Sequence, residues 1–390
     1  MKKLAIVSTH PIQYNAPWFK LLAQRQNIDI KVFYTWSQAA TTVEDKTFGK
    51  QIEWDIPLLE GYNYEFVENT AKKPGVHHFL GINCPELVNS IKAYKPDTVL
   101  VFGWNFKSHL KTLRYFKGKI PVWFRGDSTL LDEVPGVKTK LRRLVLSWIY
   151  KHVDTALFVG DANKAYFLKH GLKEEQLAYV PHAIDNERFN DNESNQYEQK
   201  AAQWRTDLGF FNKDIVVLFA GKFESKKQPE FLMNAIIEAN KNSKKSLKLV
   251  MVGDGPLVKE LKQQASTYDF ITFVPFQNQT KMPIVYRLGN VFCLPSKGPG
   301  ETWGLAVNEA SSCTRPVIVS DKVGCAEDIL NKGKNGWVFR HDNENELIKI
   351  LESLTQERLQ IAGRNAEQSI KSWSFEAIVS NIESQLTDGK

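Results

Sequence analysis

The chain has 390 residues, of which 42% are hydrophobic and 24% charged, and its formal net charge is +7 at pH 7. This length fits two or three domains, and the composition is ordinary for a soluble globular protein. No apolar run approaches the length of a membrane-spanning helix. The positive charge suits an anionic partner, such as a nucleotide-linked substrate, a membrane surface or a nucleic acid, although solvated lysines explain it equally well.

The cysteines and the N-terminus indicate a cytoplasmic protein. Cys84, Cys293, Cys313 and Cys325 show no C-x-x-C spacing, which favours reduced thiols over a disulfide framework or a zinc site. The first residues imitate a signal peptide, but their apolar core is too short, so we expect a first strand there.

In the first half, short apolar runs alternate with amphipathic stretches, which predicts a parallel α/β sheet. We expect helices over residues 18–25 and 85–94 and strands over residues 4–8, 28–35, 64–67, 97–102, 120–125 and 155–159. The second half repeats this style, with strands expected over residues 215–219, 247–252, 271–273, 291–294 and 316–319.

The polar run from Asn190 to Gln196 reads as a solvated linker or surface loop near the domain boundary. We therefore expect two Rossmann-like doubly wound domains, residues 1–183 and 184–370, and a C-terminal segment, residues 371–390. Two such domains leave a cleft between the carboxyl ends of their strands, where ligands bind.

Several common cofactor and metal motifs are missing. No G-x-G-x-x-G follows the first strand and no Walker-A lysine loop occurs, so a nicotinamide or ATP site is unsupported. Gly253-Asp254-Gly255 follows a strand but lacks the third glycine. No D-x-D occurs, and the pair His77-His78 lacks metal-ligand spacing, so we expect no metal and no cofactor.

The stretch from Pro295 to Ala310 predicts a strand, a Gly/Pro loop and a helix. If Glu301 lies at the helix mouth and Glu309 on its body, about 12 Å of helix axis separates them. The N–H groups of Trp303, Gly304 and Leu305 then lack helical partners and favour a diphosphate, with the two carboxylates binding hydroxyl-rich rings on either side. The alternative is that both glutamates are surface charges.

Two lysines follow another predicted strand. Gly221 allows a tight turn there, while Lys222 and Lys227 can project from the strand's carboxyl end. Paired ammonium groups stabilise a departing diphosphate. An ordinary lysine-rich loop is the alternative.

Four segments occur in the order and spacing that are typical of family-4 retaining glycosyltransferases with the GT-B fold: residues 180–185, 221–229, 252–256 and 295–309. The chain resembles this family strongly over residues 155–337 and more weakly toward the N-terminus. The resemblance implies a nucleotide-sugar donor bound by the C-terminal domain, an acceptor bound mainly by the N-terminal domain, and a last helix that returns to the N-terminal domain. It also implies transfer with retention at the anomeric carbon, without a metal.

The resemblance also implies individual roles. Glu301 resembles the glutamate that contacts the donor sugar, and Glu309 the one that binds the ribose. Lys227 matches the family's lysine, and Lys222 stands where arginine is more common. The ammonium group of a lysine lacks the planar guanidinium that binds a phosphate through two parallel hydrogen bonds. Phe276 is expected to border the base, and Trp303, Gly304 and Leu305 to adjoin the phosphates.

The N-terminal domain departs further from the family. The loop containing His10, Gln13 and Tyr14 replaces a glycine-rich loop, so it should face the acceptor without the glycine-dependent contacts. Asp127, or Arg125, is predicted to take the place of a histidine near the reacting sugar, with Asp127 orienting an acceptor hydroxyl. A helix cap is the alternative for Asp127.

Two further features of the N-terminal domain have alternative interpretations. His109 is assigned to the acceptor side or, alternatively, to a helix surface. The basic and apolar stretch of residues 138–151 is expected to bury Leu141, Leu144, Val145 and Trp148 against the sheet. The alternative is a peripheral contact with anionic lipid at the inner face of the membrane.

The sequence therefore predicts a retaining, metal-independent hexosyltransferase in the synthesis of a surface polysaccharide or glycolipid. Its expected catalytic residues are Asp127, Glu301 and Lys227. The competing hypotheses are a nucleotide-sugar epimerase of similar build and a non-catalytic subunit of the same fold. Nucleic-acid binding rests on the basic charge alone, and we do not expect it.

Overall fold

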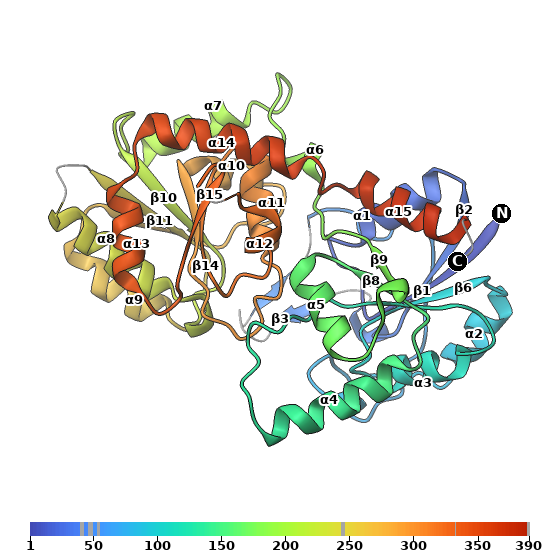
Figure 1. The fold of residues 1–390 in the computed structure, drawn as a ribbon. Helices are drawn as coiled ribbons and strands as arrows, with labels where there is room; N and C mark the ends of the chain where they lie inside the picture. Colours follow the sequence, from blue (N-terminus) through green and yellow to red (C-terminus); the bar gives the residue numbers. More distant parts are fainter. Residues whose placement is uncertain (40–42, 46–49, 53–54, 243–245, 332, 388–390) are drawn as a thin grey trace. The chain divides into compact units, whose positions relative to one another are not determined.

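The computed structural model describes residues 1–39, 43–45, 50–52, 55–242, 246–331 and 333–387. The chain forms two units (Figure 1). Unit 1 contains nearly all residues up to Ala183 and the segment from Ser374 onward, and unit 2 contains Ile184–Trp373. The chain thus changes unit at 183/184 and at 373/374, where the sequence suggested 183/184 and 370/371.

Unit 1 is built on seven parallel strands. Their spatial order is β5 (Asn63–Phe66), β2 (Ile28–Tyr34), β1 (Lys2–Ser8), β6 (Thr98–Phe102), β7 (Val122–Arg125), β8 (Thr155–Phe158) and β9 (Leu177–Tyr179). The order reverses direction between β1 and β6. The sequence that imitates a signal peptide is therefore an interior strand of this sheet.

Alternating side chains of β1 bury on opposite faces of the unit 1 sheet. Ala5 and Val7 join the core under α2 (Leu87–Tyr94), α3 (Lys107–Phe116), α4 (Val137–Tyr150) and α5 (Asp161–Lys169). Leu4 and Ile6 join the core under α1 (Ala16–Gln24) and α15 (Phe375–Thr387). The last helix thus packs on unit 1, close in space to the first.

Unit 2 contains six parallel strands. Their spatial order is β12 (Ile271–Val274), β11 (Leu247–Val252), β10 (Ile215–Ala220), β13 (Val291–Leu294), β14 (Val317–Ser320) and β15 (Gly336–Phe339). Numbered from β10, this is the order 3-2-1-4-5-6 of the doubly wound fold, whose ligands bind where the order reverses. Here that point lies between the carboxyl ends of β10 and β13.

Helices cover both faces of the unit 2 sheet. One face packs on α8 (Pro229–Asn242), α9 (Val258–Gln264), α13 (Glu344–Glu352) and α14 (Gln356–Ile370). On the other face, Tyr286 of α10 (Met282–Leu288) packs edge-on against Phe292 of β13 with 5.4 Å between the ring centroids, and α11 (Leu305–Ser312) buries Val307 and Ala310.

The remaining elements of the chain are short strands, helices and 3₁₀ turns. They are β3 (Val43–Asp45), β4 (Lys50–Ile52), α6 (Asn186–Phe189), α7 (Tyr197–Asp207), α12 (Ala326–Ile329) and the 3₁₀ turns η1 (Ser37–Ala39), η2 (Phe79–Gly81), η3 (Glu174–Gln176), η4 (Ser225–Lys227) and η5 (Ala265–Thr267).

The predicted α/β class and every predicted strand are confirmed, with ends shifted by two residues or fewer. All four cysteines are buried and unbridged, as predicted. The prediction that Leu141, Leu144, Val145 and Trp148 bury against the sheet is wrong, because all four are exposed; the residues of α4 that bury are Leu146, Ile149 and Tyr150.

The loop after β11 packs backbone against backbone on the loop after β10. A Cβ on Gly253, whose φ is +145°, would lie 2.0 Å from the carbonyl oxygen of Gly221, and the Gly221 N–H donates to the Val252 carbonyl at 3.0 Å. The glycine therefore allows a close approach of two loops that a side chain would prevent.

We expect Gly253→Ala to lower the free energy of unfolding by about 3 kcal/mol or more, because strain and overpacking add. Gly209→Ala is the matched control in the same unit, since Gly209 also has a positive φ (+77°) but no atom within 4 Å of the added Cβ. It should cost only about 1 kcal/mol. Thermal unfolding of both variants measures the difference, and equal midpoints would contradict the steric explanation.

Candidate functional site

Two loops of unit 2 meet where the strand order reverses. The loop after β10 carries Lys222 and Lys227, and the loop after β13 carries Glu301. The Lys297 N–H donates to the Lys226 carbonyl at 2.9 Å, which joins the two loops directly. The topology thus brings together lysines and a glutamate that are more than 70 residues apart in sequence.

Glu301 is held by two partners. Its Oε2 forms an ion pair with the Lys227 ammonium group and accepts a hydrogen bond of 2.8 Å from Ser296 Oγ. The side chains of Lys227 and Glu301 are only 21% and 12% exposed. Ser296 in turn accepts a bond from the Ser320 hydroxyl at the end of β14 through its carbonyl oxygen. A fixed, largely buried carboxylate–ammonium pair results, and Ser296 is a participant whose role the sequence did not indicate.

The helix after this loop starts later than expected. Residues 301–304 are not helical, and Gly304, with φ +96°, precedes the first helical residue, Leu305. A Cβ on Gly304 would lie 2.8 Å from Val323 Cγ1, so a side chain is excluded there by space as well as by φ. Only the part of this segment from Leu305 to Glu309 is helical. That part covers about 6 Å of helix axis, where a helix from Glu301 onward would cover about 12 Å.

Glu309 is buried, with 3% of its surface exposed, and it accepts a hydrogen bond of 2.6 Å from Tyr286 Oη of α10. Together with the ion pair of Glu301, this burial shows that the interpretation of both glutamates as surface charges is wrong. Tyr286 was not anticipated, because a tyrosine in an amphipathic helix reads as an ordinary core residue.

The aromatic residues of the predicted donor site differ in exposure. The Trp303 side chain is buried: its Nε1 donates to Asn308 Oδ1 at 3.0 Å, and its ring lies 5.0 Å from that of Trp373. Its side chain therefore fixes the loop, and only its backbone is suited to a ligand. Phe276 is 40% exposed just beyond β12. It remains a predicted contact for a base.

In unit 1, Arg125 is buried at the carboxyl end of β7. Its guanidinium donates to the carbonyls of Val180 at 2.7 Å and Pro181 at 2.9 Å, which ties β7 to the segment after β9. Burial lowers the pKa of Arg125 to about 10, and nearby Asp127 opposes this shift. Because the Arg125 guanidinium already donates to these two backbone carbonyls, Asp127 is the better candidate for a contact with the acceptor.

Asp127 lies beside His182, with 3.7 Å between Oδ2 and Nε2. The Asp127 side chain is 49% exposed, whereas that of His182 is 19% exposed. Burial lowers the pKa of His182, and the nearby Asp127 carboxylate partly opposes this shift. The helix-cap alternative for Asp127 is wrong, because the next helix, α4, begins at Val137 after Gly136.

The loop after β1 holds His10, Gln13 and Tyr14, all of intermediate exposure. His10 Nδ1 lies 2.9 Å from Thr9 Oγ1, and its ring packs edge-on against Trp36 at 5.3 Å. Burial lowers the pKa of His10 to about 4, so its imidazole is neutral at pH 7. The loop follows the strand at which the order of the unit 1 sheet reverses.

His109 has no exposed surface, so a helix-surface position is wrong. Its Nδ1 faces the Phe102 carbonyl at 2.8 Å and must carry the proton, while Nε2 lies 2.8 Å from Thr35 Oγ1. Burial lowers its pKa to about 4. Both nitrogens bind protein groups, and we do not retain His109 as an acceptor-side residue.

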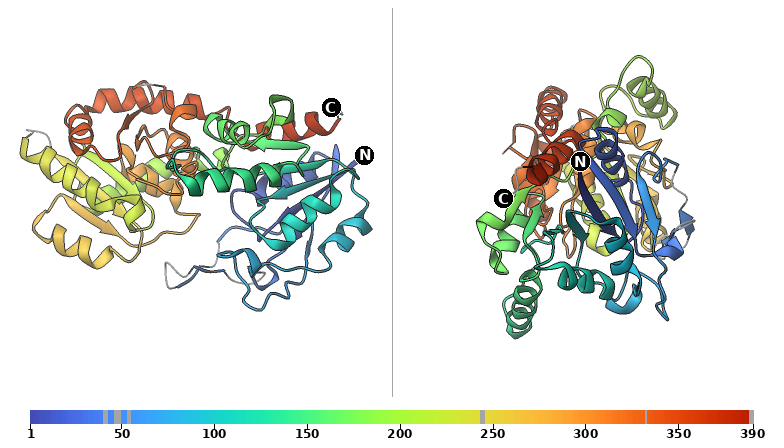
Figure 2. Two further views of the ribbon diagram at one scale, coloured as in Figure 1. Left: turned by 60° about the horizontal axis from the view of Figure 1, so that its bottom comes forward. Right: turned by 90° about the vertical axis from the view of Figure 1, so that its right-hand side faces the viewer.

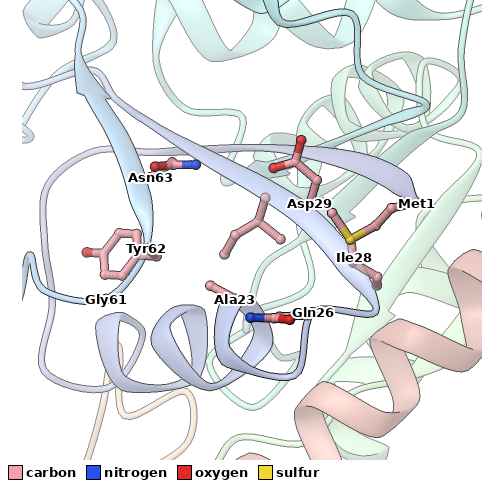
Figure 3. A pocket seen from close by; sticks show the side chains of 9 residues that line it. Met1, Ala23, Gln26, Ile28, Asp29, Gly61, Tyr62 and Asn63 are labelled. Atoms are coloured by element: carbon pink, nitrogen blue, oxygen red, sulfur yellow. The ribbon is translucent and has the colours of Figure 1, made fainter.

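A cavity of about 520 Å³ lies in unit 1 (Figure 3). It is lined by Met1, Ala23, Gln26, Ile28, Asp29, Ile30, Gly61, Tyr62 and Asn63. These residues lie at the amino ends of β1, β2 and β5, away from the carboxyl ends where ligands of such sheets bind. The cavity therefore does not coincide with any predicted site residue.

Among the residues that the structure describes, no group of three or more His, Cys, Asp or Glu residues is arranged to hold a metal ion. Within the same residues, no helix has both the length and the apolar character needed to cross a bilayer.

Residues 200–371 match the family model "Glycosyl transferases group 1". A D-inositol 3-phosphate glycosyltransferase of Gordonia bronchialis is 28% identical over 188 residues, which cover 45% of this chain and 40% of that protein. An alpha-monoglucosyldiacylglycerol synthase of Acholeplasma laidlawii is 27% identical over 232 residues, covering 58% and 55%. The chain thus spans about half or less of the length of these curated relatives.

The whole fold also has a close match among solved structures. Anabaena HepE in complex with UDP and glucose superposes with a TM-score of 0.69 at 18% identity, covering 99% of this chain and 100% of that one. This likeness concerns the fold alone. The match to the glycosyl transferases group 1 model therefore lies within unit 2, and the chain has the GT-B fold.

Proposed function

We propose that this protein is a retaining glycosyltransferase that moves a sugar from a nucleoside diphosphate to a hydroxyl of a glycan or lipid-linked acceptor, without a metal ion. The observation that carries the proposal is the Lys227–Glu301 pair at the reversal point of the unit 2 sheet, beside the start of α11 and inside the matched residues. The relatives' names support it, since they include a D-inositol 3-phosphate glycosyltransferase and an alpha-monoglucosyldiacylglycerol synthase.

In this proposal the donor diphosphate lies over the start of α11. The N–H groups of Gly304 and Leu305 and the positive end of the helix dipole favour an anion there, and Lys222 and Lys227 screen its charge. Glu309 accepts hydrogen bonds from the ribose, Glu301 from the transferred sugar, and Phe276 borders the base. The HepE structure contains UDP and glucose, which makes a uridine nucleotide the first donor to test.

The proposed reaction needs no protein nucleophile. The acceptor oxygen attacks the anomeric carbon from the face that the diphosphate leaves, so one C–O bond forms as the C–O bond to phosphate breaks. The acceptor proton passes to an oxygen of the departing phosphate. Lys222 and Lys227 stabilise the charge that develops on that group, and Glu301 orients the sugar.

For the acceptor we propose Asp127 as the residue that orients the reacting hydroxyl. Its side chain is half exposed at the carboxyl end of the unit 1 sheet, where Oδ2 lies 3.7 Å from His182 Nε2. The oxygens of a carboxylate accept hydrogen bonds from hydroxyl groups. His10, Gln13 and Tyr14 complete the proposed acceptor side.

Thermal unfolding with UDP-, GDP- and ADP-sugars tests the donor class. At about 100-fold excess over its dissociation constant, the correct donor stabilises the protein by about 2.7 kcal/mol, or roughly 5–10 °C for a unit of this size. A protein whose unfolding midpoint shifts with none of these donors would not use a UDP-, GDP- or ADP-sugar.

We expect Lys227→Ala and Glu309→Gln to weaken donor binding by roughly tenfold to a hundredfold, because each removes a charge-assisted contact. Lys226→Ala is the matched control: Lys226 is the adjacent lysine, but it is exposed and pairs with Glu224 at 3.3 Å. Calorimetric titration with the nucleoside diphosphate measures the effect. If the three variants bind alike, the assignment of the donor site is wrong.

Asp127→Asn should lower kcat by roughly 10²-fold while leaving the affinity for the nucleoside diphosphate unchanged, since it removes a charge near the acceptor alone. Sugar transfer and donor hydrolysis are measured side by side. Donor conversion without any acceptor would instead favour an epimerase, and donor binding without turnover a non-catalytic subunit. Wild-type transfer rates in Asp127→Asn would remove Asp127 from the mechanism.

A further inference from the structure

The helix α4 has two apolar faces on opposite sides. Leu146, Ile149 and Tyr150 are at most 3% exposed and belong to the core of unit 1. The second face is a stripe on solvent with the helical spacing i, i+4, i+7, i+8 and i+11, and its members are 43–83% exposed: Val137, Leu141, Leu144, Val145 and Trp148. At about 100° per residue, this stripe covers roughly 100° of the helix surface.

Cationic side chains flank this apolar stripe. Projected around the helix, Lys140 and Lys151 lie on one side of it and Lys138 on the other, and all three are exposed. Arg143, on the flank nearer the protein, pairs with Glu133. From Val134 to His152 the sequence contains no Asp or Glu.

The neighbouring helix α3 extends the cationic surface. Lys107, Lys111 and Arg114 stand at i, i+4 and i+7 of α3 and are exposed, and this helix also lacks Asp and Glu. The Arg114 guanidinium lies 5.5 Å from the ring of Trp148, so the cationic row of α3 meets the C-terminal end of the stripe. Figures 1 and 2 show α4 at the periphery of unit 1, with its N-terminal turns projecting outward.

We propose that this face of α4 inserts into the headgroup region of an anionic lipid bilayer, with the stripe in the acyl boundary and the lysines on the phosphates. A helix with apolar side chains on one face, cations beside them and a tryptophan at one end of that face is suited to that boundary. A second copy of this chain would bring a like-charged surface to the stripe, which disfavours self-association. The inference does not depend on the transferase assignment.

Flotation of the purified full-length protein with lipid vesicles tests the proposal. The wild type should bind vesicles of equal parts phosphatidylglycerol and phosphatidylcholine, lose binding as salt is raised, and fail to bind pure phosphatidylcholine. The double variant Leu141→Gln/Leu144→Gln should bind these vesicles at least roughly tenfold more weakly than the wild type, because it removes both leucines of the stripe.

Phe211→Gln is the matched control, since Phe211 is 67% exposed but lies in unit 2. It should bind as the wild type does, and Lys138→Gln/Lys140→Gln should need less salt for release. Since all changed side chains are exposed, unfolding midpoints should stay constant. Wild-type protein that does not float, or leucine variants that bind like the wild type, would overturn the proposal, and an acidic protein would then be the partner to seek.

Discussion

The candidate site depends on one topological constraint, the reversal of strand order between β10 and β13. Parallel strands end at the same edge of the sheet, so the two loops on either side of the reversal must lie together, however far apart they are in sequence. The Lys297–Lys226 backbone bond and the Lys227–Glu301 ion pair join these loops. Gly253 and Gly304 then allow neighbouring loops to approach closely enough for the arrangement to pack. Backbone proximity comes first, and the charges occupy positions that the sheet has already set.

Burial makes these charges costly, and this cost points to a ligand. A carboxylate that is 12% exposed and one that is 3% exposed both lose hydration, and a buried pair often contributes no more to stability than apolar side chains of the same size. Hydrogen bonds from Ser296 and Tyr286 offset part of that loss. A core that needed only stability would be served by leucines here. Keeping carboxylates and lysines at the reversal point is explained if they bind a ligand that offers hydroxyl groups to the carboxylates and an anionic group to the lysines, as the proposed function requires.

Much of the fold was predictable because its strands are continuous apolar runs bounded by turns, a pattern that survives without tertiary information. β9 and β15 were missed because runs of three or four residues carry little pattern, although the equally short edge strands β5 and β12 were predicted. At the site, the positions of Glu301, Glu309 and Lys227 followed from spacing and resemblance. Their partners did not: Ser296 and Tyr286 reach the glutamates through tertiary packing, which no local pattern encodes. His109 was misplaced for the same reason, since Thr35, far away in sequence, supplies the hydroxyl that lets it be buried.

In helix α4, the sequence pattern does not determine which face of the helix packs against the sheet. Its apolar residues occupy two opposite faces, and one sheet can cover only one of them. Periodicity predicts that a helix with so many apolar residues buries them, but it cannot choose the face. The structure buries the face containing Leu146 and Ile149 and leaves Leu141 and Leu144 on solvent. The distribution of charge agrees with that choice, because the lysines border the exposed stripe and would be desolvated if the helix were rotated by half a turn. The same flanking cations that keep this face outward also make it complementary to an anionic surface.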